Sequence, residues 1–174
     1  MSDVLPSRFT SSSRRSYSDT SHLLARTAPV VVCRPVAAAP ELAAHHEIRH
    51  EVFVVEQGLF ADSDVDAHDA DPDTVHLLGL VGDEPAGTVR LWPQGSGIWK
   101  GDRLAVLHRQ RHVGLGRPLV RLAVTTAAEL GGDRMNAQVQ VGTVRFFQAL
   151  GWAVDGEPYD YLGAIHQHMT IELR

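Results

Sequence analysis

The chain has 174 residues, a formal net charge of −5 and a hydrophobic content of 44%. This length and composition suit one globular domain with a substantial core. The acidic balance predicts no nucleic-acid partner, because proteins that bind nucleic acids carry basic surfaces. No apolar run approaches the roughly 20 residues of a membrane-spanning helix, so we expect no membrane association. Cys33 is the single cysteine, which excludes an intramolecular disulfide and favours a reducing compartment, the cytoplasm.

The first segment of the chain is polar. Residues 1–28 are rich in Ser, Thr and Arg, and their apolar residues show no helical or strand periodicity. Such a composition buries too little apolar surface to fold alone. We therefore expect a disordered tail, or an arm that docks on a partner subunit, ahead of a single domain over residues 29–174.

The domain is predicted to open with a strand and a helix. The apolar run 30–36 indicates a strand, in which Cys33 is expected to be a buried small side chain. A helix is expected over 40–56, with a proline in its first turn and a glycine beyond its end. An Asp-rich polar loop is expected over 61–73.

The remaining segments are predicted to complete a sheet. Alternating apolar residues indicate a hairpin, followed by further strands that two helices interrupt. The expected strands cover 75–81, 86–92, 98–106, 135–139, 152–154 and 168–173, and the expected helices cover 116–130 and 143–150. This order predicts an α/β fold with one mixed central sheet of about six or seven strands and helices on both faces.

A glycine-containing loop joins the strand 98–106 to the helix that follows it. Gly114 and Gly116 allow the backbone to approach an anion without a Cβ clash, and Arg111 and Arg117 add positive charge. The first N–H groups of a helix have no partner within the helix, and the helix dipole favours negative charge there. The loop therefore predicts a site for a phosphate or pyrophosphate group.

The same loop carries a family signature. The spacing Arg111-x-x-Gly114-x-Gly116 resembles the R/Q-x-x-G-x-G/A motif of the GNAT acetyltransferases. The segments 104–106 and 146–152 are also similar to that family, and the resemblance covers about residues 29–173. It implies the GNAT fold for the whole predicted domain.

Within that superfamily, three segments resemble one subgroup. Residues 48–58, 99–104 and 166–169 are most similar to bacterial GNAT proteins linked to nitrogen-starvation gene clusters. The resemblance to this subgroup does not identify a substrate.

The resemblance implies acetyl-CoA as the co-substrate. In the family, the pantetheine arm pairs with an open strand edge, the glycine loop takes the pyrophosphate, and later residues line the far side of the arm. On this chain these roles fall on Leu104, Ala105 and Val106 for the arm, on Arg111, His112, Val113, Gly114, Leu115, Gly116 and Arg117 for the pyrophosphate, and on Gln140, Thr143 and Phe147 for the far side.

Acetyl transfer to an amine needs a base, donors for the oxyanion, and an acid for the leaving thiolate. The resemblance implies the Val106 amide as an oxyanion donor. The tyrosine that often serves as the acid is replaced by Phe147, and a common asparagine by Gln140. We therefore take Glu56 and His166 as candidate bases and Tyr161 as a candidate acid. Further candidates are Asp66, His68 and His168 as bases and Tyr159 as an acid.

Two segments resemble metal sites. His46-Glu47-x-x-His50 is an H-E-x-x-H pattern on an expected helix, which would suit a zinc hydrolase, but the sequence offers no clear third ligand. The aspartates at 62, 64 and 66 resemble the start of a calcium loop, but its sixth position is alanine where the sharp turn needs glycine. We expect no metal, and we expect the Asp-rich loop, with Asp66 and Asp69, to border the acceptor cleft and attract a cationic substrate.

The sequence thus predicts an enzyme that transfers an acetyl group from acetyl-CoA to a primary amine of a small molecule. It does not identify the acceptor, and a homodimer is one assembly compatible with it. A non-catalytic acyl-CoA-binding regulatory protein is the alternative from a different class, because Phe147 replaces the usual acid. The zinc hydrolase is the more remote alternative.

Overall fold

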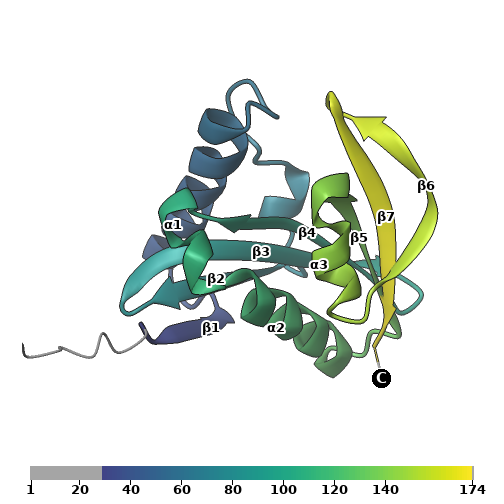
Figure 1. Cartoon of the computed structure of the whole chain (residues 1–174). Coiled ribbons are helices and arrows are strands. Elements are labelled where there is room, and N and C mark those ends of the chain that lie inside the picture. The colour runs from purple at the N-terminus through teal and green to yellow at the C-terminus, as the bar shows by residue number, and fades with distance from the viewer. Residues whose placement is uncertain (1–28, 174) are drawn as a thin grey trace, which may run out of the picture.

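The computed structural model describes residues 29–173, so the predicted tail at 1–28 lies outside the described residues. One seven-stranded sheet runs through the domain in the order β1-β2-β3-β4-β5-β7-β6 (Figure 1). The strands are β1 (Val31–Pro35), β2 (Val75–Val81), β3 (Glu84–Gly95), β4 (Ile98–Val106), β5 (Arg134–Gln140), β6 (Ala153–Tyr161) and β7 (Ala164–Glu172).

Three α-helices accompany the sheet within these residues, together with shorter helical turns. The α-helices are α1 (Ala39–Arg49), α2 (Gly116–Glu129) and α3 (Val144–Gln148). A π-helical segment, η1 (His50–Glu56), continues α1, and the 3-10 turns are η2 (Ala67–Ala70), η3 (His108–Val113) and η4 (Val141–Thr143). None of the described helices is long and apolar enough to cross a membrane.

The sheet is mixed, as predicted. Neighbouring strands are antiparallel except for β4 and β5, which run parallel. The connection between these two parallel strands carries the glycine loop and α2, the arrangement that parallel neighbours require. The glycine loop therefore follows the carboxyl end of β4 directly.

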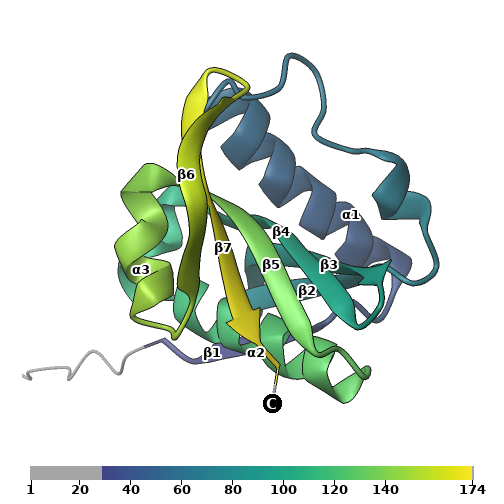
Figure 2. The same cartoon turned by 90° about the vertical axis from the view of Figure 1, so that its right-hand side faces the viewer.

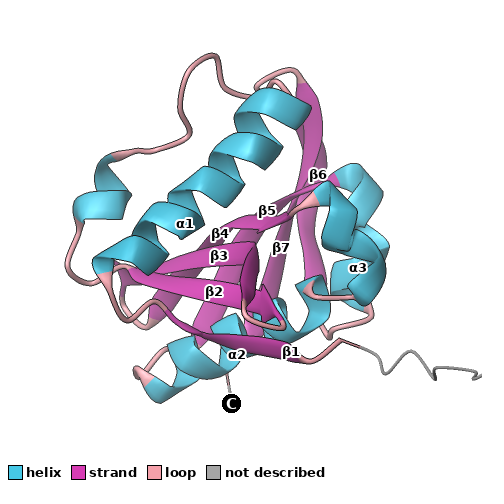
Figure 3. Ribbon diagram, turned by 90° about the vertical axis from the view of Figure 1, so that its left-hand side faces the viewer, coloured by secondary structure: helices cyan, strands magenta, loops and turns pink. Residues whose placement is uncertain are grey.

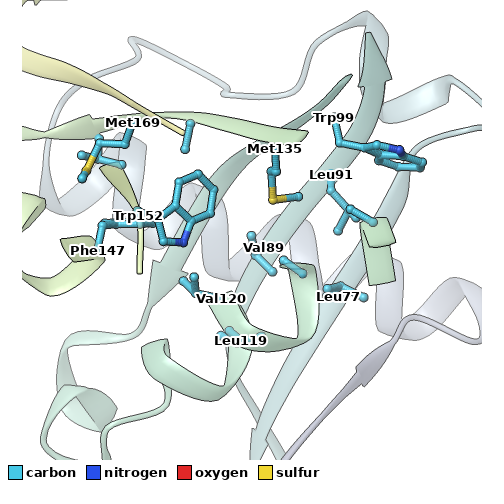
Figure 4. Packing of buried hydrophobic residues seen from close by; sticks show 14 of the residues in the cluster. Leu77, Val89, Leu91, Trp99, Leu119, Val120, Met135, Phe147, Trp152 and Met169 are labelled. Carbon is cyan, nitrogen blue, oxygen red and sulfur yellow. The ribbon is translucent and has the colours of Figure 1, made fainter. Parts of the chain in front are cut away.

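The two long helices pack on opposite faces of the sheet (Figures 1 and 3). Strand alternation divides the core accordingly, because successive side chains of a strand point to opposite faces. Leu77 packs with Leu119 and Val120 of α2, whereas its neighbour Leu78 packs with Ile48 of α1. Figure 4 shows the larger of these two clusters, which continues beyond α2 to Trp152 and the end of the sheet.

The late strands are longer than the sequence predicted. The expected strands 152–154 and 168–173 are parts of the hairpin β6–β7, which lies beside β5 (Figure 2). Strand β6 forms the exposed edge of the sheet, and its register shifts between Asp155 and Tyr159. An irregular edge strand that is exposed on both faces lacks the strict apolar alternation by which a strand is detected.

Candidate active site

The parallel strands β4 and β5 separate partway along their length. They pair only from Ile98 with Arg134 to Gly101 with Ala137. Beyond that point β4 stays paired with β3, while β5 pairs with β7. No strand of the described chain pairs with the outer edge of β4 over residues 102–106, so this edge can bind an extended ligand.

A cavity of about 1040 Å³ is lined by residues of both separating strands. Small-molecule sites commonly measure roughly 300–1,000 Å³, so the space suits a large ligand. Most residues expected to bind the co-substrate line it: Leu104, Ala105, Val106, Arg111, Gly114, Gly116, Arg117, Gln140, Thr143 and Phe147. Of the remaining three, His112 and Val113 lie on the turn η3 without lining the cavity, and Leu115 packs in the core.

Leu115 anchors the glycine loop to the sheet. Its side chain is fully buried, and its Cδ atoms lie 2.9 to 3.1 Å from where a Cβ would stand at Gly79 or Gly87. Gly114 has a φ of 80°, a left-handed conformation that glycine adopts without strain. Gly116 then begins α2, whose first amides have no partner within the helix. The two strand glycines thus allow the loop to sit close to the sheet, a requirement that the sequence analysis missed.

Val106 turns its backbone groups toward the open edge of β4. The N–H of Leu107 donates to the carbonyl of Ala86 at 2.9 Å, on the β3 side. Successive residues of a strand direct their backbone groups to opposite edges, so those of Val106 point away from β3. Its carbonyl accepts a hydrogen bond from Arg111 Nε at 3.1 Å. Its N–H faces the same side, where it can stabilise negative charge that develops on a thioester oxygen.

Glu56 is the ion-pair partner of Arg111. Arg111 Nη1 lies 2.7 Å from Glu56 Oε1, and Arg111 Nη2 donates to Glu56 Oε2 at 2.8 Å. The next residue, Gln57, accepts a hydrogen bond from Gln140 at 3.0 Å. Glu56 does not line the cavity, whereas Gln57 does. The carboxylate predicted as a base therefore holds an arginine of the predicted pyrophosphate loop and does not face the cavity.

His166 lies at the cavity wall, where β5 and β7 pair. It is 7% exposed and stands opposite Gln140 in the strand register. Its Nδ1 lies 2.8 Å from the carbonyl oxygen of Ala164, which can only accept a hydrogen bond. Nδ1 therefore carries the proton in the neutral ring, and the free lone pair is on Nε2. A buried imidazole with a fixed tautomer is suited to accept a proton at that atom.

Aromatic side chains surround His166. Tyr161 also lines the cavity, and its ring packs edge-on against His166 with centroids 5.4 Å apart. Tyr159 stacks on His168 with centroids 4.8 Å apart, and neither of these two residues lines the cavity. Of the candidates on the hairpin β6–β7, the structure therefore brings Tyr161 and His166 to the cavity.

Arginine side chains bind the carboxylates of the Asp-rich loop and hold it in place. Asp66 lines the cavity, accepts hydrogen bonds from Arg90 and Arg103, and caps the turn η2. Burial raises the pKa of Asp66, but hydrogen bonds from Arg90 and the nearby positive charges outweigh this effect and hold the pKa below its ordinary value. Asp64 and Asp69 are buried and paired with Arg49. The carboxylates of Asp64 and Asp66 thus bind arginines and do not form a calcium loop. Asp69 was expected to border the acceptor cleft, but it does not line the cavity.

Several residues that line the cavity were not anticipated, among them Lys100, Trp92 and Phe60. Lys100 is 9% exposed, and burial lowers the pKa of its ammonium group. Trp92 stacks on His68 with ring centroids 3.7 Å apart, and both line the cavity, as does Phe60. Strand alternation was the available signal for Lys100, because it places residues 100 and 102 on one face of β4.

The H-E-x-x-H segment does not form a hydrolase site. Glu47 and His50 are exposed on α1 and η1, away from the cavity. Among residues 29–173, the one group of three side chains close enough to hold a metal ion combines His45, His46 and His76, without His50. His46 and His50 are four residues apart, a spacing that usually places two side chains on one helix face. Here His46 joins the group of three histidines, whereas His50 is exposed to solvent.

The comparisons with known proteins agree with this geometry. Residues 42–152 match the model of the acetyltransferase (GNAT) family. The chain belongs to the GNAT family. An uncharacterized N-acetyltransferase of Bacillus subtilis, YjcF, is 29% identical over 124 residues, which are 71% of this chain and 86% of YjcF. A putative acetyltransferase of the same bacterium is 28% identical over 79% of this chain and 93% of its own length.

Solved structures share the fold. A putative N-acetyltransferase from Lactobacillus plantarum superposes with a TM-score of 0.75 at 28% identity, covering 83% of this chain and 99% of its own. Escherichia coli ElaA gives a TM-score of 0.73 at 24% identity, covering 81% of this chain and 99% of its own, and shows the fold alone.

As a GNAT protein with N-acetyltransferase relatives, the chain is an acyltransferase that uses acetyl-CoA or another acyl-CoA. The non-catalytic and zinc-hydrolase alternatives are not supported.

Proposed function

We propose that this GNAT enzyme transfers the acetyl group of acetyl-CoA to a primary amine of a small molecule, with His166 as the general base. The observation that supports His166 as the base is the contact of its Nδ1 with the Ala164 carbonyl. This contact leaves Nε2 as the basic atom of a residue at the cavity wall. The open edge of β4 and the glycine loop support the positions proposed for the pantetheine arm and the pyrophosphate.

The proposed reaction begins at the ammonium group of the acceptor. Nε2 of neutral His166 takes one proton from the ammonium form of the acceptor, and the resulting amine nitrogen forms a bond to the thioester carbon. The N–H of Val106 stabilises the oxyanion of the tetrahedral intermediate. The carbon–sulfur bond then breaks, and the coenzyme A thiolate takes a proton from the Tyr161 hydroxyl or from water. The nitrogen gives its second proton to the Tyr161 phenolate or hydroxide so formed, and His166 releases its proton to solvent. The products are an amide and free coenzyme A.

Two further assignments belong to this proposal. Residues 48–58 support placing the chain in the GNAT subgroup linked to nitrogen-starvation genes, and the single cysteine supports a cytoplasmic location. The exposed edge strand β6 supports a homodimer, because an unpaired strand edge can pair with a second copy. Light scattering coupled to size-exclusion chromatography tests the dimer, and a monomer mass across the concentration range would remove that assignment.

Thiol release with acetyl-CoA and a panel of primary amines tests the proposed base. We expect His166→Gln to lower kcat by about 10²- to 10⁴-fold while the Kd for coenzyme A changes little. His168→Gln is the matched control, because it removes a histidine two residues along β7 that lies outside the cavity. We expect it to keep near-normal kcat.

Glu56→Gln separates the two candidate bases. If Glu56 only holds Arg111, its loss mainly weakens coenzyme A binding and lowers kcat by less than about tenfold. A full kcat for His166→Gln, or loss of kcat in Glu56→Gln with unchanged coenzyme A affinity, would contradict the assignment.

A further inference from the structure

Three histidine side chains converge beneath the Asp-rich loop, outside the cavity. His45 and His46 lie on α1, and His76 lies on β2. One ring nitrogen from each lies within 4.8 Å of the others. The rings meet edge to face, with centroids 4.9 to 5.9 Å apart. None of the three lines the active-site cavity.

Each of these rings has a buried nitrogen without a hydrogen-bond partner. The atoms are Nδ1 of His45, Nε2 of His46 and Nδ1 of His76. Buried polar atoms of native proteins are nearly all paired, so three unpaired nitrogens in one place indicate a missing partner. His45 is itself fully buried, and its unpaired Nδ1 has no access to water.

The surroundings of His45 prepare this nitrogen to act as a ligand. Its other nitrogen, Nε2, lies 3.4 Å from the carbonyl oxygen of Val89. A carbonyl only accepts, so Nε2 carries the proton and Nδ1 keeps its lone pair. Histidines that bind metals usually donate their second ring N–H to such a carbonyl.

We propose that His45, His46 and His76 bind one zinc ion. Ligands of a tetrahedral zinc ion stand about 2.0 Å from the metal and so about 3.3 Å from one another. A point equidistant from three atoms 4.8 Å apart lies about 2.8 Å from each, so every ring needs to move by less than about 1 Å. Asp69 Oδ1 accepts a hydrogen bond from Arg49 and lies 3.6 Å from His46 Nε2, close to the spacing of two ligands on one ion, so its second lone pair can take the fourth position.

The neighbouring charges favour a cation. The histidines adjoin a partly buried network of arginines and aspartates in which three positive charges face four negative ones. Its members are Arg49, Arg90, Arg103, Asp64, Asp66, Asp69 and Asp102. The network therefore carries one net negative charge, which offsets part of the metal charge. The His46 side chain is 31% exposed, so an ion can enter from solvent.

Such an ion would act as a structural clamp. It would join α1 to β2 and, through Asp69, to the turn η2. The same turn carries His68 at the cavity wall, next to its capping residue Asp66. Zinc would therefore fix the acceptor side of the active site without taking part in the reaction, so the inference does not depend on the proposed function.

Titration of the metal-free full chain with Zn²⁺ tests the site. We expect one zinc ion per chain by calorimetry, and a thermal midpoint raised by at least about 4 °C at excess zinc. His46→Gln, the most exposed of the three positions, is expected to weaken zinc binding at least tenfold and to remove most of the thermal shift. His50→Gln is the matched control on the same helical run and is expected to bind zinc like the parent chain.

Co²⁺ gives a readout that does not depend on any variant. Tetrahedral coordination by nitrogen ligands produces strong visible absorption, whereas six-coordinate Co²⁺ absorbs weakly. We expect the strong spectrum from the parent chain and its loss on addition of Zn²⁺. Absence of zinc binding by the folded parent chain, a weak six-coordinate cobalt spectrum, or equal affinity in His46→Gln would each overturn the inference.

Discussion

Leu115→Ala separates the anchoring of the glycine loop from its charge. The change removes three carbon atoms from a side chain that is fully buried against Gly79 and Gly87. The lost transfer free energy is about 2.4 kcal/mol at about 0.8 kcal/mol per carbon. The cavity that remains raises the expected loss of unfolding free energy to about 3–4 kcal/mol. A domain of ordinary stability stays folded after such a loss.

The same variant is expected to weaken co-substrate binding. Without its anchor the loop has to be ordered when the pyrophosphate binds, and an ordering cost of about 1 kcal/mol raises the Kd about fivefold. Urea unfolding followed by circular dichroism measures the stability, and titration calorimetry with coenzyme A measures the affinity. Leu130→Ala, at a position that is 55% exposed after α2, is the control and is expected to change stability by less than about 0.5 kcal/mol.

Two results would refute the reasoning about Leu115. A loss of unfolding free energy below about 1 kcal/mol would mean that the side chain does not fill the space between the two strand glycines. A large loss of stability with an unchanged coenzyme A affinity would mean that the loop does not depend on its anchor.

The remaining predictions concern a close contact and a titration. Gly132→Ala places a Cβ 2.5 Å from Trp99 Cδ1 and 2.9 Å from a backbone carbonyl oxygen, so we expect a loss of about 1–3 kcal/mol in thermal unfolding. Gly142→Ala has no atom within 4 Å of the new Cβ and is expected to keep or slightly raise the melting midpoint, so equal midpoints for the two variants would contradict the packing. Hydrogen bonds from Arg34 lower the pKa of Glu41 from about 4.5 to about 2, and carbon-13 NMR should find this value. Because the folded pKa lies below the unfolded one, the stabilisation is present above about pH 4.3 and is lost as the pH falls through 2. A Glu41 midpoint near 4.5, or one unmoved by Arg34→Ala, would refute the pairing.

Much of the fold could be predicted because the relevant signals are local. The strands 75–81 and 98–106 have the predicted bounds, and the helix predicted over 116–130 is Gly116–Glu129. The helix expected over 40–56 changes to π-helical pairing at His50, a distinction that apolar periodicity does not carry. Most of the exposed strand β6 was not predicted, because solvent on both sides removes the alternation that marks a strand.

The candidate site was predictable in part. The glycine loop could be recognised because phosphate-binding loops need particular residue types at fixed spacing along the chain. The partners of its side chains were not visible. Arg111 pairs with Glu56 across 55 positions, and Arg90 reaches Asp66 across 24, and neither pair leaves a periodic trace in the sequence.

By itself, the sequence determined the order of helices and strands and the glycine-containing loop before α2, because each depends on neighbours along the chain. Only the tertiary structure decided which side chains face the cavity. It turned Glu56 away to Arg111, brought His166 to the wall, and joined His76 to two histidines of α1. Side-chain chemistry at a site depends on distances through space, and those follow from how the sheet and helices pack.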